Sequence, residues 1–177
     1  MRIMQNNNQK ISALRDLLDY DALSFITAEV HLEKNVKRWI NEATSLQLKT
    51  VLQKYLVFIH EHEQNINAFY ESEKINAVTI SNRIVQAYID DTNDKLARCQ
   101  DAEVKDACLL ANIQAINHYK ISAYGTAAAF ASALEMDKQA DAFRKAEINE
   151  KQIDDRLTQL AQFEINLRAK APIVLQG

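Results

Sequence analysis

One stretch constrains the fold of this chain more than any other: residues 117–126, NHYKISAYGT. We expect it to be helical, yet the face that should be apolar carries Asn117, Lys120 and Tyr124. A buried ammonium group is costly unless an anion faces it. The sequence therefore predicts that acidic side chains from other helices lie opposite Lys120.

The composition of the 177 residues favours an all-α fold. Glycine occurs only at positions 125 and 177, and the single proline is Pro172. Almost nothing between residues 11 and 170 therefore breaks a helix, and straight-chain helix formers are abundant. A chain of this length normally forms one domain with a sizeable core. We expect one domain over 1–177, with flexible tails at 1–10 and 171–177.

Several partner and compartment classes are disfavoured by the sequence. The net charge is −3 with the signs interspersed, which argues against nucleic acid as a partner. No run of about 18 apolar residues would span a membrane, and the N-terminus lacks the apolar core of a signal peptide. Cys99 and Cys108 are too few for a disulfide framework. We expect a reduced, cytoplasmic protein without a catalytic cysteine.

Apolar residues recur at steps of three and four, which predicts four long helices at 11–43, 45–74, 102–134 and 138–169. Thr44, followed by Gln47, has the pattern of an N-terminal capping box. Asp137 is the expected N-cap of the last helix. The short turns join the helices into two antiparallel hairpins.

Residues 75–101 form the connection between these hairpins. We expect an extended crossing segment and a short helix at about 80–96, which frays or breaks at the polar run 90–94. A hairpin, a long crossover and a second hairpin are typical of a ferritin-like four-helix bundle. At ~1.5 Å per residue, helices of roughly 30 residues are about 45 Å long.

Each predicted helix carries polar residues at a similar depth. Glu29, His62 and Glu150 come from the first, second and fourth helices, and Asn117 and Lys120 come from the third. One interpretation is a metal layer, in which Glu29, His62 and Glu150 hold iron or manganese. However, di-iron bundles use a Glu-x-x-His motif on two helices, and this chain has none. We favour the other interpretation, in which Lys120 balances Glu29 and Glu150, His62 is a core histidine, and no cofactor is bound.

Six short motifs connect these residues to a known family. They are Ala28-Glu29-x-x-Leu32, Glu71-Ser72-Glu73, Asp106-Ala107, His118-Tyr119-x-Ile121-x-x-Tyr124-Gly125-Thr126, Glu150-Lys151-x-x-Asp154 and Leu157-Thr158-x-Leu160-Ala161. Over residues 11–161 the chain resembles the YciE/YciF-like family of ferritin-like bacterial stress proteins. The resemblance implies a ferritin-like fold and a stress-related role whose biochemistry is poorly defined.

The chain departs from that family on three helices. Where the family carries Val-Glu-His-Tyr-Glu, this chain has Ile-Asn-His-Tyr-Lys at 116–120. In the second helix, the family's acidic element is replaced in this chain by Tyr-Leu-Val-Phe-Ile at 55–59. In the fourth helix, where the family has a run of glutamates, this chain has Ile-Asn-Glu at 148–150. Only Glu29 and Glu150 match former ligand positions. The resemblance thus implies a degenerate di-metal site.

Three functional hypotheses follow. The first is a non-catalytic protein of the YciF-like stress family, with a Lys–carboxylate core in place of metal. The second is a residual iron or manganese protein with oxidase or peroxide-related activity. The third is a structural module that forms a homodimer through outward apolar residues such as Trp39 or Phe143. We expect a homodimer, and the sequence does not identify another protein partner.

Overall fold

The computed structural model describes residues 2–3, 10–73, 75–76 and 80–170. For residues 2–3 and 75–76 it describes the backbone alone. The predicted tail at 171–177 lies outside the described residues, and so does most of the predicted tail at 1–10.

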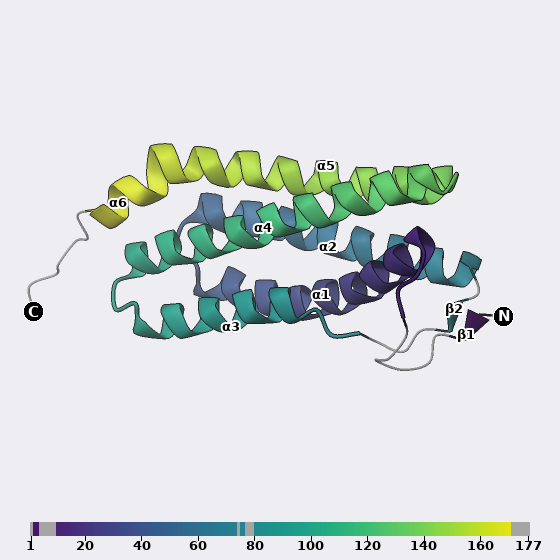
Figure 1. Cartoon of the computed structure of the whole chain (residues 1–177). Coiled ribbons are helices and arrows are strands. Elements are labelled where there is room, and N and C mark those ends of the chain that lie inside the picture. Colours follow the sequence, from purple (N-terminus) through teal and green to yellow (C-terminus); the bar gives the residue numbers. More distant parts are fainter. Residues whose placement is uncertain (1, 4–9, 74, 77–79, 171–177) are drawn as a thin grey trace, which may run out of the picture.

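Four long helices form the bundle (Figure 1): α1 Leu14–Glu42, α2 Leu46–Glu73, α4 Ala102–Ala133 and α5 Asp137–Leu160. The bounds of α1, α2 and α4 agree closely with the prediction, whereas the fourth helix was predicted to run to residue 169 and α5 ends at Leu160. At its carboxyl end α5 continues through a π-helical turn, Ala161–Ile165, into α6, Asn166–Lys170. The sequence contains no recognisable signal for that change of helix type.

The topology is that of a ferritin-like bundle with one long crossover. Helices α1 and α2 form one hairpin and α4 and α5 form the other; α1 also packs on α4, and α2 on α5. The crossover carries α3, Arg83–Arg98, which lies against α1 and α4. Because the crossover returns the chain to the end where α2 begins, α2 and α4 run in the same direction (Figure 1). The predicted fold is confirmed.

Two short strands lie at one end of the bundle, beside the end of α2 (Figure 1). Strand β1, Arg2–Ile3, pairs in parallel with β2, Ile75–Asn76, which begins the crossover. This pairing was not predicted.

The prediction that the crossover helix breaks at residues 90–94 is wrong, because α3 is continuous through them. Two residues of the polar run contribute to packing on the bundle. Thr92 is fully buried and donates to the Tyr88 carbonyl, while Asn93 Oδ1 accepts from the Trp39 indole Nε1 at 3.0 Å. The polar run therefore attaches α3 to α1.

Both predicted N-caps are displaced by one residue. Helix α2 is capped by Ser45, whose Oγ accepts from the Leu48 amide at 3.2 Å. Thr44 instead donates its amide and hydroxyl to the buried Asp106 carboxylate of α4, at 2.8 and 2.6 Å. Helix α5 begins at Asp137, so its N-cap is Met136. In the first case a contact distant in sequence recruits the side chain that the local pattern assigned to the cap.

The apolar core consists of two clusters, one toward each end of the bundle. One cluster includes Trp39, Leu52 and Ile113, and the other includes Phe25, Phe69 and Phe143. Trp39 and Phe143 are buried in these clusters, so they are not the exposed dimer-forming residues suggested above. Between the clusters lies a layer of polar side chains, which is the candidate site.

Candidate functional site

The polar layer draws one or more side chains from each of the four long helices. Its predicted members, Glu29, His62, Asn117, Lys120 and Glu150, are all at most 2% exposed. On every helix they fall at the boundary between the two apolar clusters. The layer is therefore a dry, highly charged section through the middle of a hydrophobic bundle.

Lys120 is the centre of this layer. Its Nζ lies 2.9 Å from Glu29 Oε2 and 2.5 Å from Glu150 Oε1. It also donates to the Tyr55 hydroxyl at 3.3 Å. The ammonium group thus donates to Glu29 and Tyr55 and forms an ion pair with Glu150, so it contacts oxygens from α1, α2 and α5. It bridges carboxylates 121 positions apart in the chain (150 − 29).

The remaining carboxylate oxygens also have donors. The Tyr124 hydroxyl donates to Glu29 Oε1, and the Asn117 side-chain amide donates to Glu150 Oε2. Each carboxylate therefore receives one neutral donor in addition to the shared ammonium group. Such satisfaction is what a buried ion pair requires if desolvation is not to destabilise it.

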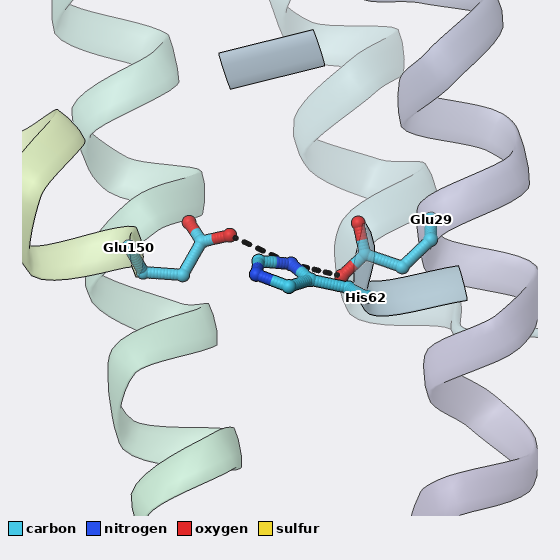
Figure 2. Close-up of side chains that lie close together, drawn as sticks. All are labelled: Glu29, His62 and Glu150. Carbon is cyan, nitrogen blue, oxygen red and sulfur yellow. Dashed lines mark ion pairs between the residues drawn. The ribbon is translucent and has the colours of Figure 1, made fainter. Parts of the chain in front are cut away.

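His62 lies between the two carboxylates (Figure 2). Its Nδ1 is 3.4 Å from Glu29 Oε1 and 3.5 Å from Glu150 Oε1, while Nε2 faces the Asn149 amide at 3.4 Å. The long distances fit electrostatic contacts better than a strong, directed hydrogen bond. Because Asn149 can donate to Nε2, a proton on Nδ1 would face the carboxylates.

Two members of the layer escaped the sequence analysis. Tyr55 was considered only as part of the segment 55–59 that replaces an acidic element, and Asn149 only as part of the segment 148–150. Tyr55 is fully buried and Asn149 is 6% exposed. Tyrosine occurs in many apolar stripes, so nothing in the sequence marks its hydroxyl as a partner of Lys120.

Two other histidines, His118 and His60, lie outside the layer. His118 is largely exposed and its Nε2 lies 3.0 Å from Asp154 Oδ1 on α5. His60 is also exposed, beside Glu33 at 3.6 Å, although it is only two residues from the buried His62. This difference follows from helical geometry, in which residues two apart face different directions.

The charges of the layer are strongly coupled. Burial alone would lower the pKa of Lys120, but Glu150 and Glu29 outweigh it and hold that pKa above its ordinary value. Burial opposes the ionisation of Glu29 as well, yet Lys120, His62 and Tyr124 lower its pKa to about 2. Burial raises the pKa of Glu150 against the opposing effect of Lys120 and His62. Glu29 is therefore the firmly ionised carboxylate.

One further proton would make the layer neutral. Two carboxylates and one ammonium group leave a net negative charge in a site closed to water. Glu150 is the group placed to carry that proton, because burial raises its pKa.

The side chains fit an ammonium group better than a metal ion. Glu29, His62 and Glu150 each offer a ligand atom, and these atoms lie within 4.8 Å of one another. However, Lys120 Nζ lies within ion-pair distance of both carboxylates, and Asn117 contributes an amide donor to Glu150. A cation and a donor at these positions oppose the binding of a divalent ion. The layer as built therefore does not match a di-metal donor set.

Acid is expected to destabilise the fold through Glu29. Its pKa is lowered from 4.5 to about 2, so its contribution is fully present above pH 4.5 and is lost as the pH falls toward 2. The loss between pH 7 and pH 3 is about 2 kcal/mol of unfolding free energy. Urea unfolding at both pH values measures it.

The matched variants are Glu29→Gln and Asp155→Asn, the second at an exposed position. We expect Glu29→Gln to be less stable at pH 7 but to lose less stability on acidification, whereas Asp155→Asn behaves like the parent. An undiminished acid dependence in Glu29→Gln would show that another group is responsible.

Comparison with known proteins assigns the family. Residues 13–170 match a family described as a domain of unknown function, DUF892. The chain belongs to this family. It is 27% identical over 145 residues to protein YciF of Escherichia coli (strain K12), across 81% of this chain and 87% of YciF. The YciF-like resemblance inferred from the motifs is thus confirmed.

Solved structures similar to this DUF892 chain share its fold. The crystal structure of the E. coli stress protein YciF aligns with a TM-score of 0.81 at 25% identity, covering 88% of this chain and 99% of YciF. YcfI from Rhodopseudomonas palustris also gives a TM-score of 0.81, at 23% identity, covering 86% of this chain and 98% of YcfI. In the described part of this chain, no helix has the length and apolar character needed to cross a membrane.

Proposed function

We propose that this chain is a non-catalytic member of the DUF892 family, in which a buried Lys–carboxylate ion pair replaces a di-metal site. The observation that carries the proposal is the position of Lys120 Nζ, 2.9 Å from Glu29 and 2.5 Å from Glu150. An ammonium group supplies the positive charge that the carboxylates need, but it offers neither an open coordination position nor a redox-active centre.

The chemistry of the layer supports this proposal in two further ways. Both carboxylates also receive neutral donors, from Tyr124 and Asn117. The site is fully buried, which fits a structural role better than a reaction with substrate. The role that remains is a structural or binding one, exerted by the outer surface of the bundle.

The similarity to YciF supports a proposal for the cellular role. The similar E. coli protein YciF is described as a stress protein, and on that similarity we propose that this chain acts in a stress response. We further propose that it acts in the cytoplasm as a homodimer or through another protein.

Metal analysis tests the proposal directly. The protein is expressed with iron and manganese supplementation, purified without chelators, and analysed for iron, manganese and zinc. We expect far less than one metal atom per chain, because Lys120 competes for the same carboxylates. Added Mn²⁺, Fe²⁺ or Zn²⁺ should likewise leave the melting temperature unchanged. Stoichiometric metal in the purified protein would overturn the proposal.

A second candidate is a residual metal protein in which Glu29, His62 and Glu150 hold one iron or manganese ion, with oxidase or peroxide-related activity. It is favoured by the convergence of three ligand atoms within 4.8 Å. It requires Lys120 to leave the carboxylates. Metal bound near one equivalent, and lost in Glu150→Gln, would select this candidate over the first.

A further inference from the structure

Two cysteines meet where α3 turns into α4, outside the polar layer. Cys99 is the C-cap residue of α3, and Cys108 lies near the start of α4. Both are free thiols and both are partly exposed. The Cys99 side chain is among the groups that raise the pKa of the Cys108 thiol.

The packing of α3 on α4 places the two cysteines opposite each other. Lys95 lies one turn before Cys99, and Asn112 lies one turn after Cys108; Lys95 Nζ donates to Asn112 Oδ1 at 3.4 Å. In an antiparallel helix pair, contacts move one turn back on one helix for each turn forward on the other. Cys99 and Cys108 are the next facing positions toward the turn. The Asn112 side-chain amide also lies 3.6 Å from Cys108 Sγ.

We propose that Cys99 and Cys108 form a reversible disulfide when the protein meets a hydroperoxide, which ties the crossover helix α3 covalently to α4. This would be an oxidative modification site, distinct from the polar layer and independent of whether that layer binds metal. Oxidation is expected at thiols that are accessible and have a second thiol close enough to resolve the intermediate.

The disulfide would form in two steps. The Cys99 thiolate attacks a peroxide oxygen, the O–O bond breaks, and the products are a Cys99 sulfenic acid and water or an alcohol. The Cys108 sulfur then attacks the sulfenic sulfur, the S–S bond forms, the S–O bond breaks and water leaves. Two electrons and two protons pass from the thiols to the hydroperoxide oxygens, and a thiol reductant reverses the bond.

The surroundings assign the two roles. Cys108 packs against the apolar core, and burial, together with Cys99, raises its pKa to about 11. Cys108 is therefore the less reactive thiol toward peroxide at neutral pH, and it loses its proton as it attacks the sulfenic sulfur. Cys99 ends its helix in an extended conformation, φ −74° and ψ 120°, beside the exposed Gln100. Its backbone can therefore adjust to the narrow geometry that a disulfide requires.

Peptide mapping detects the bond. The native protein is treated with one equivalent of hydrogen peroxide, alkylated under denaturing conditions and digested with trypsin, which cleaves after Arg98 and Lys105. We expect the intact mass, measured before alkylation, to fall by about 2 Da. After digestion, peptides 99–105 and 106–120 should be linked until dithiothreitol is added. Cys108→Ser should instead accumulate a sulfenic acid at Cys99, trapped by dimedone, and Cys99→Ser should react much more slowly.

A comparison with the unfolded chain separates native proximity from nearness in sequence. The equilibrium with reduced and oxidised glutathione is measured in buffer and in concentrated urea. We expect the effective thiol concentration to fall at least about tenfold in urea. Two free thiols after peroxide treatment, disulfide-linked dimers in place of the internal bond, or equal effective concentrations in both solvents would each overturn the proposal.

Discussion

Lys120→Met should destabilise the protein by about 3–5 kcal/mol, because it leaves two buried carboxylates without their cation. For a chain of this size, that loss lowers the melting temperature by about 6–20 °C. Lys120 is 2% exposed and lies 2.9 Å from Glu29 and 2.5 Å from Glu150. Urea and thermal unfolding at pH 7 measure the effect. A melting temperature equal to that of the parent would contradict the central role of Lys120.

The chain provides a matched control for this variant. Lys151 also lies 2.5 Å from a carboxylate, that of Glu147, but its side chain is 54% exposed. Exposed ion pairs contribute about 0–1 kcal/mol, so Lys151→Met should change stability little. Adding Glu150→Gln to Lys120→Met should restore part of the lost stability, since it removes one of the two stranded charges. No recovery in the double variant would indicate lost packing rather than lost charge balance.

The helices and their order were predictable from local patterns. Apolar spacing and the near absence of glycine and proline defined the four long helices, and the long connection between two hairpins defined the topology. The polar layer was inferred from its misfits: a lysine in an apolar seam required acidic partners at the same depth. Lys120 allows this inference because burying an ammonium group is unfavourable unless acidic side chains face it.

What the sequence did not predict depends on contacts distant in the chain. Thr44 and Ser45 are both competent caps, and Ser45 takes the role because Asp106 binds Thr44. The polar run in α3 does not break the helix, because Asn93 meets Trp39 of α1. Tyr55 joins the layer through its hydroxyl alone. In each case a tertiary partner decides between local alternatives that the sequence leaves nearly equivalent.

The double variant Asn117→Glu/Lys120→Glu should create a metal-dependent fold. It restores the acidic pattern of the YciF-like family at these two positions, so four buried carboxylates surround His62. Without metal, their mutual repulsion should destabilise the protein by more than Lys120→Met does, because the cation is lost and two anions are gained. We expect a strongly lowered melting temperature in the presence of a chelator.

Metal should then rescue the variant and leave the parent unchanged. Glutamate oxygens and an imidazole suit Mn²⁺, Fe²⁺ or Zn²⁺, and a ligand present at 1,000 times its dissociation constant stabilises the folded state by about 4 kcal/mol. That gain raises the melting temperature by about 8–16 °C. Thermal unfolding with each metal and with chelator, on both proteins, makes the comparison. If the variant folds but no metal raises its melting temperature, then charge at positions 117 and 120 is not what separates this layer from a metal site. Rescue of the parent to the same extent would mean that Lys120 leaves the carboxylates readily, and the residual metal site would become the better account of the layer.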